Sequence, residues 1–328
     1  MRRREFIMLL GGAAAWPLVA HAQQSAKTRR IGVLMSVAPD DPEGQANIAA
    51  FLQGLAQSGW NVGQNVRVDT RWAAGNAEYG RKYATELASL TPDAVLASGG
   101  SVLPPLIQAT HSVPIVFTIV ADPVAGGFVD SLARPGGNVT GFTNFEYSLS
   151  GKWLELLKEI APAVTRAAVF RDPALTAGTG QFGAIQSVAA AIGVEVTPIN
   201  VRDASEIERA IAAFSRTPNS GLIVTGSALT SVHRNLIITL AAQHKLPAVY
   251  PLLYFAAEGG LISYGPDLVD QHRRAAGYID RILRGEKPGE LPVQAPTKYQ
   301  MLINLKTAKA LGLNVPPTVL ARADEVIE

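Results

Sequence analysis

Short apolar runs alternate with segments of helical periodicity along this chain, and the alternation comes in two successive series. In the first series the predicted strands are residues 30–36, 66–71, 94–97 and 115–117. The predicted helices between them are residues 48–55, 78–90 and 102–110. Strands separated by helices pair in parallel, because each connection crosses over the sheet in the right-handed sense. We therefore expect a parallel sheet covered by helices.

The second series begins after Gly136-Gly137-Asn138 and repeats the pattern. Its predicted helices are residues 149–160, 182–192, 204–214 and 232–243. Its predicted strands are residues 167–170, 194–199, 222–224 and 248–250. Near-continuous apolar strands suit a sheet that helices cover on both faces. The 328 residues are enough for two domains at about 150 residues each. The predicted fold class is therefore α/β, with two doubly wound parallel-sheet lobes.

The C-terminal part of the chain departs from this rhythm. An apolar run at residues 259–265 precedes a polar helix at 267–284, a proline-bearing stretch at 288–296 and a last helix. Extended proline-containing segments suit a crossing between domains, so we expect a hinge made of several chain crossings. We predict lobe 1 at residues 28–143 and about 266–296, and lobe 2 at residues 144–265 and about 297–328.

Residues 1–22 have the pattern of an export signal. Arg2-Arg3-Arg4 precedes an apolar run at residues 7–15, and Ala20-His21-Ala22 has the small residues of a cleavage site. The apolar run is too short to span a bilayer. Residues 3–7 resemble the twin-arginine (Tat) form of the bacterial signal, with a plain Sec signal or a buried N-terminal helix as alternatives. We expect cleavage after Ala22 and a periplasmic product.

Net charge gives no indication of a polyanionic partner. The chain has 29 basic and 27 acidic side chains, and removing residues 1–22 takes away three Arg and one Glu, which leaves 26 of each. A formally neutral mature protein has no electrostatic reason to bind nucleic acid or an anionic membrane surface. We expect a soluble product with no nucleic-acid partner and no membrane-spanning part.

Metal-binding patterns are missing from the sequence. There is no cysteine, which excludes disulfides, thiolate metal sites, cysteine nucleophiles and an N-terminal lipid anchor. The histidines outside the signal are widely spaced, with no HExxH or paired arrangement: His111, His233, His244 and His272. We therefore expect no metal site.

Gly178, Gly180 and Gly183 form a GxGxxG pattern between a predicted strand and a predicted helix. In a dinucleotide-binding fold the first glycine lies at the end of the strand, so that the pyrophosphate meets the helix N-terminus. Here the predicted strand ends near Phe170, and residues 171–177 intervene. We interpret these glycines as a flexible loop and expect no nicotinamide or flavin cofactor.

Residues 98–101, Ser-Gly-Gly-Ser, follow a predicted strand and precede a predicted helix. Glycines let a ligand approach the backbone closely, and free N–H groups at a helix start attract a carboxylate or another anion. A simple turn in which Ser101 caps the helix is the alternative. No lysine follows in the Walker arrangement, which disfavours a nucleotide phosphate.

Catalytic chemistry has little support in the sequence. The chain has no GxSxG motif, and no serine has a histidine at a recognisable spacing. Asp122, Asp172 and Asp267 follow predicted strands but form no evident pair of acids. We expect no catalytic residue.

Several long blocks, in a fixed order along the mature chain, resemble one family. They are Asp122-Pro123-Val124, residues 131–141, residues 259–265, Leu291-Pro292-Val293, Pro296-Thr297-Lys298, residues 304–313 and residues 320–328. Together they resemble the ABC transporter substrate-binding protein family that includes tryptophan- and tyrosine-type binding proteins. The blocks are specific for the family and not for a ligand.

The resemblance implies the type I periplasmic binding protein fold, in which two lobes are joined by a three-segment hinge and hold a ligand in the cleft between them. It also implies a monomeric, non-enzymatic solute receptor that works with the membrane subunits of an ABC permease. An exported enzyme or a sensor subunit built on the same two lobes is the alternative.

Ligands of open α/β sheets bind at the carboxyl ends of the strands. With the resemblance, this rule gives the following candidate ligand-binding residues: Ser36, Ser98, Gly99, Gly100, Ser101, Thr118, Asp122, Phe145, Tyr147, Arg171, Asp172, Gly226, Ser227, Tyr250 and Tyr254.

The expected ligand is an amino acid or a related small carboxylate. For a carboxylate we expect Ser98 with the N–H groups of Gly100 and Ser101, and for an ammonium group Asp122 or Asp172. Relatives carry an acidic residue after the strand that corresponds to residues 222–224, where this chain has Thr-Gly-Ser-Ala. This departure weakens the case for an α-amino acid and leaves other small carboxylates open.

Overall fold

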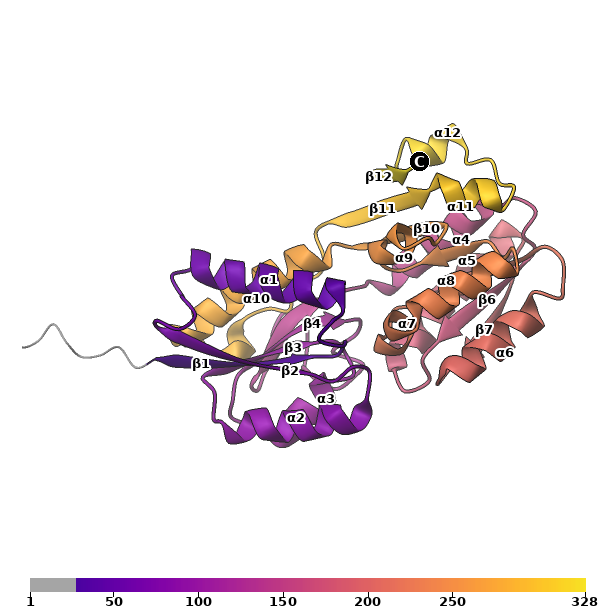
Figure 1. Cartoon of the computed structure of the whole chain (residues 1–328). Coiled ribbons are helices and arrows are strands. Elements are labelled where there is room, and N and C mark those ends of the chain that lie inside the picture. Colours follow the sequence, from indigo (N-terminus) through magenta and orange to yellow (C-terminus); the bar gives the residue numbers. More distant parts are fainter. Residues whose placement is uncertain (1–27) are drawn as a thin grey trace, which may run out of the picture.

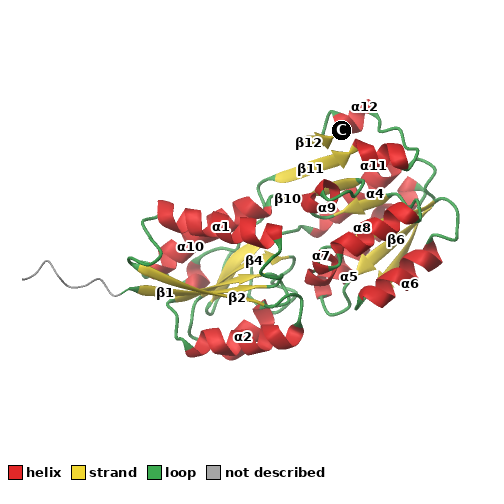
Figure 2. Cartoon of the chain, in the orientation of Figure 1, coloured by secondary structure: helices red, strands yellow, loops and turns green. Residues whose placement is uncertain are grey.

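The computed structural model describes residues 28–328 and shows two α/β lobes side by side (Figure 1). Each lobe has a central sheet with helices packed around it (Figure 2). The two-lobe α/β fold expected from the alternating pattern is confirmed. The predicted export signal at residues 1–22, with cleavage after Ala22, lies outside the described residues.

Lobe 1 contains a five-stranded parallel sheet in the order β2-β1-β3-β4-β5. Its strands are β1 (Arg29–Met35), β2 (Val66–Trp72), β3 (Ala94–Ser98), β4 (Ile115–Val120) and β5 (Val139–Thr143). Its helices are α1 (Pro42–Gln57), α2 (Ala77–Ser89), α3 (Leu103–Ala109) and, from much later in the chain, α10 (Leu268–Leu283).

Helices cover both faces of the lobe 1 sheet, as the unbroken apolar strands require. One face packs against α1 and α10, where Phe51 and Ile279 are fully buried. The other face packs against α2 and α3. Close contact between α1 and α10 depends on Gly54, because a Cβ there would lie 2.8 Å from the Cβ of Ala276. The C-terminal helix α10 is therefore an integral part of lobe 1.

Lobe 2 contains a seven-stranded sheet in the order β12-β11-β10-β9-β8-β6-β7. Its strands are β6 (Arg166–Arg171), β7 (Glu195–Asn200), β8 (Ser220–Val224), β9 (Ala248–Tyr250), β10 (Ile262–Pro266), β11 (Tyr299–Asn304) and β12 (Glu325–Ile327). All neighbours pair in parallel except β10 and β11, which are antiparallel. The sheet is thus mostly, and not wholly, parallel.

The lobe 2 helices surround one large apolar core. They are α4 (Tyr147–Ile160), α5 (Thr176–Ile192), α6 (Ala204–Phe214), α7 (Ala228–Val232), α8 (Arg234–Gln243), α9 (Leu253–Ala257), α11 (Leu305–Ala310) and α12 (Pro317–Leu320), whereas the 3-10 turn at Pro288–Glu290 contacts β5 of lobe 1. Trp153 of α4 is fully buried, and its indole N–H donates to the carbonyl oxygen of Tyr264 at 2.8 Å. This bond satisfies the one polar group that the indole brings into the core.

Within residues 28–328 the chain passes between the lobes three times: from β5 to α4, from β10 to α10, and from the 3-10 turn to β11. This agrees with the expected hinge of several crossings. The residue boundaries given above for the two lobes stay a prediction.

One local expectation from the sequence, the flexible loop, is wrong, and so is one alternative, the helix cap at Ser101. Gly178, Gly180 and Gly183 do not form a flexible loop, because α5 begins at Thr176 and includes all three. At Gly180 a Cβ would collide with the ring of Tyr147, so this glycine lets α4 and α5 pack closely. Ser101 is not the cap of a helix, because α3 begins at Leu103 and has no side-chain cap.

Candidate ligand-binding site

A cavity of about 200 Å³, partly open to solvent, lies between the lobes. Its walls are loops that follow β1, β3 and β4 of lobe 1 and loops that follow β6, β8 and β9 of lobe 2, together with the start of α1. Both sheets therefore present the carboxyl ends of their strands to one space, as expected for open α/β sheets.

Nine of the fifteen candidate residues line this cavity. They are Ser36, Ser98, Gly99, Gly100, Ser101, Asp122, Gly226, Ser227 and Tyr254. The first six come from lobe 1 and the last three from lobe 2. Their contact with a ligand stays a prediction.

Thr118, Phe145 and Tyr250 lie behind the cavity wall, because packing or hydrogen bonding buries them. Thr118 has no exposed surface, and its hydroxyl contacts the His272 ring at 3.1 Å. Phe145 packs edge-on against Trp153, with ring centroids 5.5 Å apart. The ring of Tyr250 stacks on Phe255 at 5.0 Å inside the lobe 2 core.

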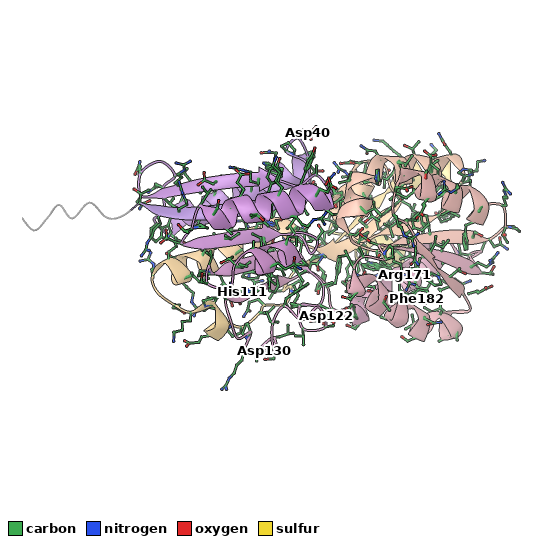
Figure 3. The ribbon with its side chains drawn as sticks, turned by 90° about the horizontal axis from the view of Figure 1, so that it is seen from below. Asp40, His111, Asp122, Asp130, Arg171 and Phe182 are labelled. Atoms are coloured by element: carbon green, nitrogen blue, oxygen red, sulfur yellow. The ribbon has the colours of Figure 1, made fainter. Side chains whose placement is uncertain are left out.

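Arg171, Asp172 and Tyr147 are also absent from the cavity lining. The Arg171 Nε–H donates to Asn200 at 2.7 Å, and its guanidinium lies over the ring of Phe182, inside lobe 2 (Figure 3). Asp172 accepts a backbone hydrogen bond from Ala174 at 2.9 Å and lies just before the lining segment 174–177.

Tyr147 supports Asp122, which Figure 3 shows at the border between the lobes. Burial raises the pKa of the Tyr147 phenol, and the Asp122 carboxylate, to which the phenol donates, raises it further. Asp122 also accepts from the Ala125 N–H at 2.9 Å. The Asp122 carboxylate is therefore already hydrogen-bonded on the protein side.

The loop at residues 98–101 presents backbone to the cavity. Gly99 has a φ of +115°, and a Cβ there would collide with Ser36 Oγ, so only glycine fits. Its N–H donates to Thr118 O at 3.0 Å. The next two N–H groups, of Gly100 and Ser101, donate to no group among residues 28–328. They are free to bind an anion.

His272 of α10 holds this loop from behind. Its Nδ1 lies 2.8 Å from Leu268 O, and its Nε2 lies 2.9 Å from Ser98 Oγ and 3.1 Å from Thr118 Oγ1. The carbonyl requires the proton on Nδ1, so Nε2 accepts from both hydroxyls. Complete burial lowers the pKa of His272 to about 4. The ring is therefore neutral at physiological pH.

The first turn of α1 adds acidic and amide groups to the cavity. Asp41 caps the helix by accepting from the Gly44 N–H at 2.8 Å. Glu43 and Asn47, one helical turn apart, both line the cavity. Burial raises the pKa of Glu43, and the nearby Asp41 carboxylate raises it further. The side-chain oxygen of Asn47 is buried without a hydrogen-bond partner.

An ion pair joins the lobes beside the cavity. Arg234 Nη1 of α8 lies 2.6 Å from Asp41 Oδ2, while its Nε lies 2.8 Å and 2.9 Å from the Glu258 oxygens. Burial alone would lower the pKa of Arg234, but the two carboxylates outweigh it and raise the pKa. The guanidinium also lies over the ring of Tyr254, 5.3 Å from its centroid. One lobe 2 side chain thus binds a residue at the lobe 1 rim.

Ile119 lies in strained backbone at the cavity wall. Its φ is +58°, which is unfavourable for a β-branched residue. The strain coincides with a register shift between Phe117 and Val120 at the end of β4. This bulge turns the Ile119 side chain toward lobe 2, where it packs against the core of that lobe. Strain of this kind is typical of ligand-binding segments.

The sequence model of the ABC transporter substrate binding protein family matches residues 30–327. The chain belongs to this family. Its resemblance to the family at the sequence blocks described above is thereby confirmed.

Relatives of this chain match most of its length. A tyrosine-binding protein of Clostridioides difficile (strain R20291) is 26% identical over 295 residues, which are 88% of this chain and 82% of that protein. The Streptococcus pneumonia domain solved in complex with L-Trp is 24% identical, with a TM-score of 0.86 over 92% of this chain and all of that one. A conserved domain protein of Vibrio cholerae is 28% identical, with a TM-score of 0.85 over the same shares.

A further substrate-binding protein was solved open and without ligand. This Clostridium difficile protein, described as having adhesive properties, is 25% identical, and its TM-score is 0.68 over 91% of this chain and 99% of that one.

Within residues 28–328, no helix is both long and apolar enough to cross a bilayer. In that same part of the chain, no three His, Asp or Glu side chains gather closely enough to bind a metal.

Sequence reasoning missed Glu43, Asn47, Arg234 and His272. The spacing of Glu43 and Asn47, four residues apart at a helix start that follows a strand, was a usable signal. Arg234 and His272 gave none, because Arg234 lies 193 residues from Asp41 and His272 lies 174 residues from Ser98. Tertiary folding alone brings these two side chains into contact with residues that line the cavity.

Proposed function

We propose that the protein is the periplasmic solute receptor of an ABC importer, which captures an amino acid or a related small carboxylate between its lobes. The single observation that carries this proposal is the cavity whose walls come from both lobes. A ligand held by two walls binds the closed arrangement more tightly than the open one, so binding drives closure. A closed, ligand-loaded receptor is the form that the permease subunits would recognise.

The lobe arrangement supports this mechanism. The Asp41–Arg234 ion pair spans the two lobes, which requires them to be close. The chain also superposes better on the L-Trp complex, with a TM-score of 0.86, than on the open ligand-free relative, with 0.68, although both are about equally similar in sequence. We infer that the structure corresponds to the closed form.

The ligand class follows from the lining and from the relatives. The free N–H groups of Gly100 and Ser101 suit a carboxylate. Apolar side chains such as Phe128, Leu175 and Leu252 suit a hydrophobic side chain of the ligand. Because relatives are named for tyrosine or were solved with L-Trp, aromatic amino acids are the first compounds to test.

An exported enzyme is the second candidate, favoured by one contact. Ser98 Oγ and His272 Nε2 are 2.9 Å apart, near two free backbone N–H groups, as in a serine nucleophile with its base. Against catalysis, Nε2 also accepts from Thr118, and a pKa of about 4 makes the imidazole a weak base. We propose a positioning role for His272 and no enzymatic activity.

The test is ligand screening by thermal shift, followed by calorimetry, on the mature protein with the twenty amino acids, their amines and their des-amino acids. A compound that binds the folded state alone raises the melting temperature. We expect at least one amino acid to do so at micromolar concentration. A screen with no stabilising compound, or hydrolysis of p-nitrophenyl esters abolished by Ser98→Ala, would overturn the receptor assignment.

Export and assembly are tested separately. Mass spectrometry of the periplasmic protein is expected to give a mature N-terminus directly after Ala22, and light scattering is expected to give a monomer. A product that retains Met1, or that fractionates with the cytoplasm, would contradict export.

A further inference from the structure

The charged groups that line the cavity are all acidic. They are Asp41, Glu43 and Asp122, and among the residues that the structure describes no Lys, Arg or His side chain lines this space. Asp41 is paired with Arg234, and Asp122 accepts hydrogen bonds from Ala125 and Tyr147. The Glu43 carboxylate forms no hydrogen bond or ion pair within residues 28–328. The charged groups that act on Glu43 are the Asp41 and Glu258 carboxylates and the Arg234 guanidinium, so this cluster of three carboxylates and one guanidinium keeps a net negative charge beside the cavity.

Two further acceptors in the same lining lack partners. The side-chain oxygens of Asn47 and Asn144 are buried and accept no hydrogen bond, and each residue is only 4% exposed. Buried polar atoms are almost always hydrogen-bonded, so an unpartnered oxygen at a cavity wall indicates a group supplied by a ligand. That group must be a donor.

We propose that the cavity binds a ligand carrying a protonated primary amine, held by the Glu43 carboxylate and the Asn47 side-chain oxygen on one face of α1. This proposal rests on the proposed function and specifies its ligand class. An ammonium group has three N–H donors and no acceptor, which matches a carboxylate beside an unpartnered amide oxygen. Asn144, from the first crossing between the lobes, offers a third acceptor in the same lining.

The positive end of the α1 dipole does not oppose this arrangement. Asp41 accepts from the Gly44 N–H and places a carboxylate on that end of the helix. Glu43, in the first turn, adds a second negative charge. The local field at this helix start therefore favours a cation.

The same geometry disfavours a plain carboxylate ligand. Such an anion would enter a partly desolvated cavity with acidic side chains and no basic one in its described lining, and its only donors would be N–H and hydroxyl groups. A zwitterion binds both ends, with its carboxylate at the 98–101 loop and its ammonium at Glu43. Asp172, expected from the sequence to bind the amine, does not line the cavity, and Asp122 is already hydrogen-bonded.

The protonation state of Glu43 supports the assignment. Burial and the neighbouring Asp41 and Glu258 carboxylates raise the pKa of Glu43, and the Arg234 guanidinium offsets only part of this effect. An ammonium ion bound at Glu43 lowers that pKa, so binding at mildly acidic pH releases a proton from the carboxyl group. Calorimetry in buffers of different ionisation enthalpy measures this release.

Calorimetry with three matched indole compounds tests the proposal: L-tryptophan, tryptamine and 3-(indol-3-yl)propanoate, with the corresponding phenol series from L-tyrosine. The wild type is expected to bind the amino acid at least tenfold more tightly than the compound without an amine. Glu43→Gln is expected to weaken binding of the amine-bearing compounds roughly tenfold to a hundredfold, the cost of losing a hydrogen bond to a charged group.

The control is Glu208→Gln, the same chemical change at an exposed position of α6 in lobe 2. It is expected to leave every affinity unchanged. Glu43→Gln removes a carboxylate that burial disfavours, so the variant is expected to keep or raise the melting temperature of the ligand-free protein. A lost affinity therefore reports on the site and not on misfolding.

Two outcomes would overturn the amine site. Equal affinity for the compounds with and without an amine, or undiminished amino-acid binding by Glu43→Gln, would leave the receptor function standing and remove the site. If neither series binds the wild type, the amino acid that stabilises it most in the thermal-shift screen takes the place of the aromatic one in the same comparison, and the proposed function itself fails only if no compound of that screen binds.

Discussion

Asp41 and Arg234 form an ion pair, with Oδ2 and Nη1 2.6 Å apart, that joins the start of α1 in lobe 1 to α8 in lobe 2. Both side chains are about nine-tenths buried, and each makes a second interaction, because Asp41 also caps α1 and Arg234 also pairs with Glu258. A buried pair holds its geometry because breaking it leaves an uncompensated charge. Separation of the lobes must therefore break the Asp41 contact.

We predict that Asp41→Asn favours the open form. Asparagine keeps the helix cap, because its side-chain oxygen still accepts a hydrogen bond from the Gly44 N–H. Arg234 keeps its ion pair with Glu258. The charge that bridges the lobes is lost, so ligand affinity is expected to fall about tenfold, in line with the roughly 1.5–3 kcal/mol of a charge-assisted hydrogen bond. Small-angle scattering is expected to show a larger radius of gyration than for the wild type.

The matched control for this change is Asp40→Asn, one residue earlier and exposed. It is expected to change neither the radius nor the affinity. An Asp41→Asn variant with wild-type radius and wild-type affinity would show that the ion pair has no part in closure.

Sequence reasoning predicted the fold well because strand and helix periodicity are local properties. Residues 30–36 and 94–97 were predicted as strands, and the structure has β1 and β3 there. From the rule that ligands bind after such strands, the 98–101 loop was expected at the site, and it lines the cavity. Neither the strand prediction nor the loop prediction requires knowing which residues far apart in the sequence are in contact.

The rest of the site depends on packing between distant segments. Glycines at 178–183 look like a loop in sequence, yet Gly180 serves contact with Tyr147 inside a helix. Tyr250 is the last residue of β9, two residues before the lining residue Leu252, but its ring lies in the lobe 2 core, where Phe255 stacks on it. Packing between segments of the same lobe therefore decides which side chains at a strand end face the cavity.

We predict that Ile119→Gly is more stable than Ile119→Ala by about 1 kcal/mol. Both variants lose the same contact with the lobe 2 core, but alanine keeps the strain of a φ near +58° and glycine relieves it. At an ordinary strand position the order is reversed, because glycine loses more backbone entropy on folding. Urea unfolding of the two variants measures the difference, and an alanine variant of higher stability would show that Ile119 is not strained in solution.

We predict that His272 makes the protein less stable as the pH falls from about 6.5 to about 4. The folded-state pKa of about 4 lies below the unfolded value of 6.5, so in this window the unfolded chain binds more protons. The stability that the neutral His272 ring contributes is fully present above the unfolded-state pKa of 6.5. It is lost as the pH falls toward the folded-state pKa of about 4. The shift corresponds to a contribution on the order of 3 kcal/mol to the free energy of unfolding.

The measurement is the slope of unfolding free energy against pH. His272→Gln is expected to lower stability at pH 7, because Ser98 and Thr118 lose their acceptor, and to flatten the slope between pH 4 and 6.5. His111→Gln, at an exposed position, is the control and is expected to keep the wild-type slope. An unchanged slope in His272→Gln would mean that the ring is accessible to protons in the folded state.

The last prediction concerns the N–H groups of the 98–101 loop. Gly100→Pro removes one donor outright, whereas Gly100→Ala keeps it. A Cβ at position 100 would approach nothing closer than Ile119 O at 3.9 Å, and the φ of Gly100 is not in the left-handed region, so alanine fits without strain. We expect the proline variant to bind L-tryptophan or L-tyrosine roughly tenfold to a hundredfold more weakly than the alanine variant. With melting curves showing both variants folded, equal affinities would mean that the ligand carboxylate binds elsewhere in the cavity.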